Sequence, residues 1–272
     1  MPYASADGVR IYYEEAGNGQ PIVLVHGATQ DTLSWHDNIG YFAERGYKVY
    51  AIDQIGHGKS ALVNARPTRT VEEFSSYLWK FIQAMDIRRP ILVGHSMGAG
   101  VSIETAINHP EEIVGVVAVD GGAHVRKASH NYHGNVLDTI AINPADWLET
   151  TFYSVLGRTT PLARQKEMAF DSGRCSPYVQ HSDLIAYTSY SFGHQMHKIK
   201  CPVHYIMGED DWSTTPAMAI ETSKMLAAEG VVTEVDVLMG VGHIPHWEQP
   251  EVFNALLEKV LKRFKTSQSG TR

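Results

Sequence analysis

Cysteine is scarce in this sequence, and long apolar runs are absent. Only Cys175 and Cys201 occur among 272 residues, so we expect two unpaired thiols in a reducing compartment and no disulfide framework. No uncharged apolar run reaches the length of a membrane span, and residues 1–8 lack the basic start and apolar core of a signal peptide. These absences predict a cytoplasmic protein without a membrane partner.

A large excess of charge is also missing. The formal net charge is −7 and no basic run occurs, which argues against nucleic acid or an anionic membrane surface as a partner. The composition, 43% hydrophobic and 19% charged, is that of a globular protein with one large domain and a sizeable core. The informative features therefore lie in the order of the residues.

Short apolar runs alternate with amphipathic segments along most of the chain. An alternating pattern over residues 9–14 predicts an antiparallel strand, and Gly17 and Gly19 predict a hairpin to the next strand. Strands are predicted at residues 22–25, 47–52, 90–93, 113–119, 203–207 and 233–238, and those at 22–25, 113–119 and 203–207 have the continuous apolar pattern of buried strands. Helices are predicted at residues 33–43, 70–85, 99–107, 216–228 and 250–264. This order favours an α/β fold with a mostly parallel sheet flanked by helices.

The alternation is interrupted between residues 123 and 200. Helical patterns in this stretch cover residues 135–142, 145–156, 162–170 and 178–192. We therefore expect residues 1–122 and 201–272 to form the core domain, with residues 123–200 as an inserted helical lid at the carboxyl edge of the sheet. Aromatic side chains of the lid would either wall an apolar substrate pocket or pack the lid helices. They are Phe152, Tyr153, Tyr187, Tyr190 and Phe192.

A glycine-punctuated turn surrounds Ser96. Residues 94–98 read Gly-His-Ser-Met-Gly and stand between the strand at 90–93 and the helix at 99–107. The glycines remove Cβ atoms that would collide in a sharp strand-to-helix bend, which leaves the serine hydroxyl above the sheet at the positive end of a helix. Such a hydroxyl is placed to act as a nucleophile, although the motif alone also fits an ordinary Gly-rich turn.

Polar residues follow two of the later strands. Asp210 and Asp211 come after the strand at 203–207, and His243 follows the strand at 233–238 on a Gly-rich loop. A serine hydroxyl needs a base within hydrogen-bond reach, and the base needs an acid on its other nitrogen. Since the chain order serine, acid, histidine is that of a nucleophile elbow, the sequence predicts a triad of Ser96, Asp211 and His243.

Other polar clusters favour structure over chemistry. Gly27 follows the strand at 22–25, where backbone N–H groups either face Ser96 or belong to a plain strand-ending turn. The loop at 53–60 lacks the spacing of a phosphate-binding motif. No metal site is predicted, because acidic or cysteine ligands at supporting spacings do not accompany the histidines at positions 130, 133, 181, 194 and 197.

Together these motifs resemble the α/β-hydrolase superfamily, in its capped branch of small esterases, lactonases and carbon-carbon bond hydrolases. The likeness covers residues 9–264. It rests on His26-Gly27-Ala28, on residues 53–60, 94–98 and 208–211, and on Gly242-His243 followed by residues 248–250. The resemblance implies an α/β-hydrolase fold that works without a cofactor.

The resemblance also implies roles for individual residues. It makes Ser96 the nucleophile, His243 the base and Asp211 the acid, with the backbone N–H groups of Ala28 and Met97 as the oxyanion hole. Candidate substrate contacts are Thr29, Phe152, Tyr153, Tyr187 and Tyr190.

Two details of the motifs bear on this resemblance. The family's proline after the acid usually comes one residue sooner than Pro216 does here, which keeps Asp210 as a competitor to Asp211. The serine at position 96 sets aside haloalkane dehalogenases and most epoxide hydrolases of this fold, which place aspartate there.

Three functions fit these motifs. The leading one is hydrolysis of a small to medium carboxylic ester or lactone, with an apolar or aromatic small molecule as substrate, through an acyl-enzyme on Ser96. The second is cleavage of a carbon-carbon bond in a diketone-like substrate by the same triad. The third is a ligand receptor that keeps the fold and signals through its lid. The sequence leaves the natural substrate and the oligomeric state open.

Overall fold

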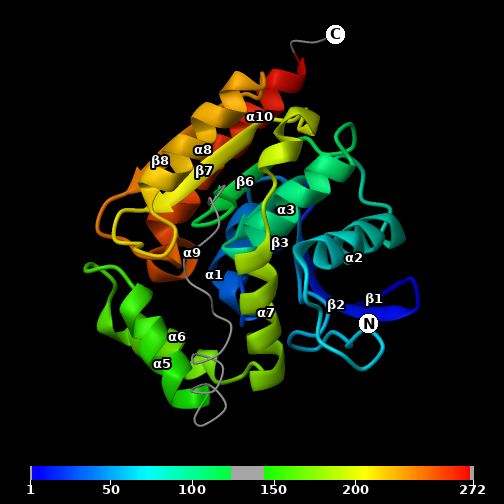
Figure 1. Ribbon diagram of the computed structural model, residues 1–272. Helices are drawn as coiled ribbons and strands as arrows, with labels where there is room; N and C mark the ends of the chain where they lie inside the picture. The colour runs from blue at the N-terminus through cyan, green and yellow to red at the C-terminus, as the bar shows by residue number, and fades with distance from the viewer. Residues whose placement is uncertain (1, 124–143, 270–272) are drawn as a thin grey trace.

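An eight-stranded sheet forms the centre of the protein. The computed structural model describes residues 2–123 and 144–269, and its sheet has the strand order β1-β2-β4-β3-β5-β6-β7-β8 (Figure 1). The strands are β1 Tyr3–Ala6, β2 Val9–Ala16, β3 Gln20–Val25, β4 Tyr47–Ile52, β5 Ile91–His95, β6 Gly115–Val119, β7 Val203–Gly208 and β8 Thr233–Leu238. All pairings from β4 to β8 are parallel, as the alternation of strands and helices predicts.

The amino-terminal hairpin differs from the predicted one. The strand at residues 9–14 is confirmed, but it pairs antiparallel with β1 and β4, so the expected hairpin with the next strand is wrong. The chain instead turns at Asp7 and Gly8, both with positive φ, as a two-residue Asp-Gly hairpin loop requires. β3 cannot pair with β2, because its two edges are occupied by β4 and β5 in parallel register.

Helices cover both faces of the sheet. On one face α2 (Val71–Ala84), α3 (Met97–Asn108) and α8 (Pro216–Ala228) enclose one apolar core, and Figure 1 shows α2 and α3 side by side. On the other face, α1 (His36–Ala43) and α10 (Pro250–Ser269) pack a second core. Short helical turns, η1 (Thr32–Trp35) and α9 (Pro245–Glu248), precede α1 and α10. The central strands are buried by both layers, which explains their continuous apolar runs.

A helical segment separates β6 from β7 in the chain. It comprises α5 (Pro144–Val155), α6 (Leu162–Ser172), α7 (Pro177–Ser189) and the turn η2 (Gly193–Lys198). These elements confirm the helices predicted at 145–156 and 162–170, whereas the helix predicted at 178–192 ends at residue 189. The helix predicted at 135–142 lies outside the described residues. Figure 1 shows α5 and α6 as a pair at the end of the molecule opposite the chain's carboxyl terminus.

Cys175 is half-buried and Cys201 is buried, and both are free thiols, as the sequence predicts. Among the residues that the structure describes, no helix has the length and apolarity needed to cross a membrane.

Candidate active site

Ser96 occupies a strained turn between β5 and α3. Its φ of +51° and ψ of −118° lie outside the ordinary regions for residues with a side chain. A Cβ atom on Gly94 would collide with the Gly98 carbonyl oxygen, and one on Gly98 would collide with the Val25 carbonyl oxygen. The Ser96 N–H donates to the Val119 carbonyl at 2.8 Å, which holds the turn on β6. The predicted strand-to-helix elbow is therefore confirmed.

Ser96, His243 and Asp211 form one hydrogen-bonded chain. The Ser96 Oγ lies 3.0 Å from His243 Nε2, and His243 Nδ1 lies 2.7 Å from Asp211 Oδ2. Asp211 Oδ1 accepts the Ser213 N–H at 2.8 Å, the Ser213 hydroxyl at 2.7 Å and the Thr214 N–H at 3.2 Å. The structure thus brings together the side chains of the predicted triad, and it adds donors to the acid that the sequence did not predict.

The neighbouring Asp210 has a different partner. Its Oδ2 accepts the Arg158 backbone N–H at 2.8 Å, and its Oδ1 forms an ion pair with the Arg158 guanidinium. The carboxylate therefore faces the connection between α5 and α6. Of the acidic pair, Asp211 contacts His243 and Asp210 does not.

The charges in this chain favour an ionised acid and a basic imidazole. Burial would raise the pKa of Asp211, but the charge of His243 and the hydrogen bonds to the carboxylate lower it below its ordinary value. Burial would also lower the pKa of His243, yet Asp211 and, to a smaller extent, Glu248 raise it above its ordinary value. His243 can therefore accept a proton from Ser96 and keep it beside a carboxylate.

Glu248 holds the loop that carries His243. Its Oε2 accepts the Gly242 N–H at 3.0 Å and its Oε1 accepts the Ile244 N–H at 2.8 Å, so one buried carboxylate clamps both neighbours of the histidine. The His243 N–H itself donates to the Val155 carbonyl at the end of α5, at 2.8 Å. The helical segment therefore helps to fix the histidine.

The loop after β3 brings backbone donors to Ser96. The Gly27 N–H donates to Gln30 Oε1 at 3.0 Å, which fixes this loop. The N–H groups of Ala28 and Met97 have no hydrogen-bond acceptor among the residues that the structure describes. Both amides remain available to an oxyanion, as the resemblance implies. Thr29, a predicted substrate contact, instead directs its N–H at Asp183 Oδ2 of α7, at 2.8 Å.

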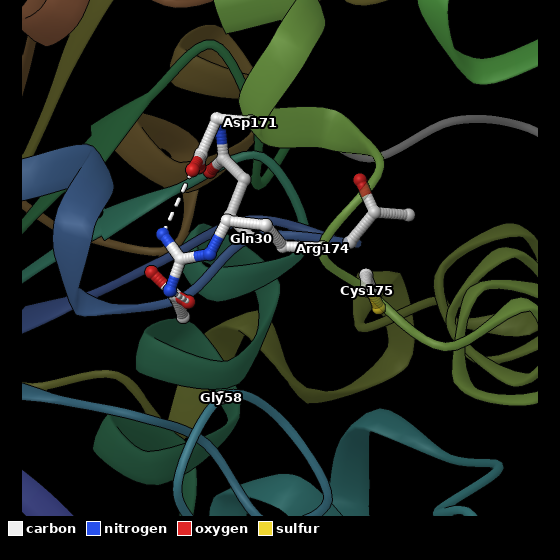
Figure 2. A pocket seen from close by; sticks show the side chains of 7 residues that line it. Gln30, Gly58, Asp171, Arg174 and Cys175 are labelled. Carbon is white, nitrogen blue, oxygen red and sulfur yellow. Dashed lines mark hydrogen bonds and ion pairs between the residues drawn. The ribbon is translucent and has the colours of Figure 1, made fainter. Parts of the chain in front are cut away.

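A small polar pocket lies where the connection from α6 to α7 meets the loops after β3 and β4. Figure 2 shows the Arg174 guanidinium directed at the Asp171 carboxylate, with an ion pair at 2.7 Å, and Asp31 pairs with the same guanidinium at 2.7 Å. Both carboxylates form ion pairs with the Arg174 guanidinium. The ion pair with Asp31 joins the helical segment to the core, and the residues that line the pocket do not include Ser96.

The predicted aromatic wall is not one surface. Phe152 packs with Met168, Ile244 and Trp247 beside the histidine loop, whereas Tyr153 is 40% exposed. Tyr187 donates to or accepts from the Thr214 hydroxyl at 3.1 Å, close to the acid.

Tyr190 and Phe192 belong to the core against α3. The Tyr190 hydroxyl donates to Glu104 Oε2 at 3.0 Å, and Phe192 is 1% exposed. Hence the five rings do not line a single pocket. Aromatic composition could not reveal this, because the partners of these rings lie far away in the sequence.

Asp120 is a neighbour of the triad that the sequence analysis did not single out. Within residues 2–123 and 144–269, one set of side chains gathers donor atoms of the kind that bind metals, Asp120, Asp211 and His243, whose atoms lie within 4.8 Å of one another. Two of these groups already bind each other at 2.7 Å. The available signal was an acidic residue at the carboxyl end of β6, between the strands that lead to Ser96 and Asp211.

Known proteins resemble this chain over about half or most of its length. A 2-hydroxy-6-oxononadienedioate/2-hydroxy-6-oxononatrienedioate hydrolase of Burkholderia vietnamiensis is 24% identical, and the match covers 94% of this chain and 92% of that protein. A protein of Mycobacterium phage D29 named as a non-heme haloperoxidase is 33% identical, but the match covers only 48% of this chain and 45% of that protein.

Similarity to a solved structure extends over nearly the whole chain. The enol-lactonase of Burkholderia xenovorans superposes with a TM-score of 0.80 at 20% identity and covers 97% of this chain and 100% of that one. At this identity the likeness concerns the fold. The profile of a known family, described as the alpha/beta hydrolase family, matches residues 22–256. Since this match spans most of the 272 residues, the chain belongs to the alpha/beta hydrolase family.

Proposed function

We propose that this protein is a serine hydrolase that cleaves a small to medium carboxylic ester or lactone through an acyl-enzyme. The observation that carries the proposal is the pair of contacts at His243, 3.0 Å from Nε2 to Ser96 Oγ and 2.7 Å from Nδ1 to Asp211 Oδ2. A hydroxyl, an imidazole and a carboxylate in this order are the parts that activate a serine nucleophile.

The reaction follows from these positions. His243 Nε2 takes the proton of Ser96 Oγ as the oxygen attacks the substrate carbonyl, and the N–H groups of Ala28 and Met97 stabilise the resulting oxyanion. The imidazolium then gives its proton to the leaving alkoxide, which departs as the alcohol and leaves an ester on Ser96. Water, activated by the same imidazole, hydrolyses that ester and releases the acid.

We propose that residues 144–200, the described part of the lid expected at residues 123–200, cover this site. Support comes from contacts on the loops around the triad: the Val155 carbonyl accepts the His243 N–H at 2.8 Å, and Asp183 accepts the Thr29 N–H at 2.8 Å. Phe152 packs against Ile244, the residue after the histidine. A segment held this close to the catalytic edge excludes water and selects substrates by shape.

A fluorophosphonate probe tests the nucleophile. We expect wild-type protein to be labelled on Ser96 and to hydrolyse a small activated ester, whereas Ser96→Ala should lose both the label and several powers of ten in kcat. Ser5→Ala, an exposed serine on β1, is the matched control and should behave as wild type. Labelling of another residue, or near-normal turnover by Ser96→Ala, would place the nucleophile elsewhere.

Carbon-carbon bond hydrolysis is the alternative, and the name of the Burkholderia vietnamiensis relative, at 24% identity, favours it. Product analysis separates the two reactions, because a diketone-like substrate would yield a carboxylic acid and a ketone or enol, and an ester would yield an acid and an alcohol. A receptor on the same fold would react with the probe but would not turn over any ester.

A further inference from the structure

Asp120 is a buried carboxyl group at the catalytic edge that the proposed reaction does not use. It follows β6, which lies between β5 and β7 in the sheet. Its exposure is 0%, its φ is +40°, and its N–H donates to the Ile206 carbonyl at 3.0 Å. The backbone therefore fixes this carboxyl group beside the strand that leads to Asp211.

The two oxygens of Asp120 have different surroundings. Oδ1 accepts the Gly208 N–H at 2.7 Å. Oδ2 is enclosed, and no N–H or O–H of the described residues points at it. Oxygen atoms of Asp120 and Asp211 and a ring nitrogen of His243 lie within 4.8 Å of one another. An ionised oxygen with no donor in such a place would be costly.

The charges that face Asp120 also disfavour its ionised form. Burial raises the pKa of Asp120 well above its ordinary value; the charges of Asp211 and Glu248 and the contact with Asp211 raise it further, and only the Gly208 N–H opposes them. The nearby positive charge, the imidazolium form of His243, is already paired with Asp211. A carboxyl group in this position therefore keeps its proton, and the proton makes Oδ2 a donor.

We propose that Asp120 is a neutral carboxylic acid whose Oδ2–H donates a hydrogen bond to the Asp211 carboxylate and so acts as a positioning residue for the acid of the triad. The inference rests on the proposed function, in which Asp211 holds His243. The two carboxyl groups share one proton and one negative charge. No proton leaves Asp120 during the reaction, and the charge stays on Asp211, where it faces the imidazole.

Infrared spectroscopy tests the protonation state without any turnover. A difference spectrum between wild type and Asp120→Asn at pH 7 in D2O should show the loss of a C=O stretch from a buried protonated carboxyl group. Loss of carboxylate bands instead would overturn the proposal. If the variant does not fold, 13C NMR of wild-type protein labelled at the aspartate carboxyl carbons gives the same answer. One aspartate should keep the carboxyl chemical shift of the protonated form at pH 7. These readouts stay valid even if the protein hydrolyses no ester.

Kinetics test the positioning. Asp120→Leu keeps much of the side-chain volume but has no donor, so kcat should fall about 10- to 100-fold, the factor expected for one hydrogen bond to a charged group, with little change in KM. The rising limb of the pH profile should move to higher pH, since Asp211 without this donor holds the His243 proton more strongly. Asp120→Asn restores a donor and should recover at least about tenfold in kcat over the leucine variant.

Two results would overturn the positioning role. If asparagine is as impaired as leucine and the limb moves to lower pH, the wild-type Asp120 carries a charge. If both variants keep wild-type kcat and the same pH profile, Asp120 only fills space behind Asp211. Thermal unfolding of each variant separates these outcomes from a loss of folded protein.

Discussion

The His57 imidazole lies 2.8 Å from the Asp183 carboxylate, and both side chains are fully buried. His57 belongs to the loop after β4 and Asp183 to α7, so this pair joins the core to the helical segment. The same Asp183 oxygen accepts the Thr29 N–H at 2.8 Å. The Asp183 carboxylate thus connects the helical segment to the loop after β3. Ala28, the residue before Thr29 in this loop, is the proposed oxyanion donor.

Asp183→Asn should weaken the contact between the core and the helical segment most at low pH. Burial would lower the pKa of His57, but the charge and hydrogen bond of Asp183 raise it above 6.5. The pair therefore contributes stability that is fully present below pH 6.5 and is lost as the pH rises through the folded-state pKa of His57. We expect a loss of about 1–3 kcal/mol in the free energy of unfolding at pH 6, shrinking at higher pH.

Urea unfolding at several pH values measures that loss. Asp86→Asn is the control, because the Asp86 side chain is 74% exposed and its ion pair with Arg88 lies at the surface. A deficit in Asp183→Asn that stays constant from pH 6 to pH 9 would contradict an ionised His57. We also expect a lower kcat in this variant, since the loop at Thr29 loses its charged acceptor.

The two adjacent acids give a second prediction. Asp211→Asn should lower kcat by about 10⁴-fold, because the amide cannot hold His243 in its tautomer or stabilise the imidazolium. Asp210→Asn should lower kcat by less than about tenfold, because its partner Arg158 is a 60% exposed side chain. Initial rates on one activated ester give both values. The reverse ranking would transfer the acid role to Asp210.

Local sequence patterns were enough to predict much of the fold and the triad. Buried strands and the elbow glycines are readable because each depends on residues next to one another in the chain. Ser96, Asp211 and His243 each stand in a short motif after a strand, and their order along the chain predicted that they would meet. The sequence missed the edge strand Tyr3–Ala6, whose four residues have only a weak alternating pattern. Contacts such as His57 with Asp183, 126 residues apart, have no local signature, so pattern reasoning could not find them.

Activity and stability should respond oppositely to pH above 6.5. Ser96 needs a neutral His243, whose pKa is raised above 6.5 by Asp211 against the effect of burial, so kcat/KM should rise through a midpoint above that value. His243 and His57 both hold a proton more strongly when folded, so the contribution of these two histidines to the free energy of unfolding should fall over the same range. A pH series of rates and urea midpoints checks this. A kinetic midpoint below pH 6.5 would contradict the Asp211 contact.

Glu248→Gln should loosen the loop that carries His243. The carboxylate accepts N–H groups on both sides of His243, from Gly242 at 3.0 Å and Ile244 at 2.8 Å, and a glutamine would turn an NH2 group toward one of these donors. We expect a loss of about 1–3 kcal/mol in stability and a clear drop in kcat. Glu251→Gln, at an exposed glutamate in the first turn of α10, is the control. Unchanged thermal unfolding in Glu248→Gln would argue against the clamp.

Tyr190→Phe separates packing from substrate selection. The Tyr190 hydroxyl donates to Glu104 at 3.0 Å, and the ring packs against α3 at Gly100. Removal of the hydroxyl leaves a buried carboxylate oxygen without this donor, so stability should fall by about 1–3 kcal/mol while the preference among short and bulky esters stays the same. Tyr178→Phe is the control, because Tyr178 of α7 is 58% exposed. This change should alter neither the stability nor the preference among esters.

Urea unfolding and an ester series on both tyrosine variants give the answer. A changed ranking of esters with unchanged stability would show that Tyr190 contacts the substrate.

Tyr187 is the aromatic candidate for substrate selection near the triad. Its hydroxyl lies 3.1 Å from the Thr214 hydroxyl, and Thr214 donates its N–H to Asp211. Tyr187→Ala should then alter relative kcat/KM between short and bulky esters by roughly 10- to 200-fold, the effect of a few apolar contacts.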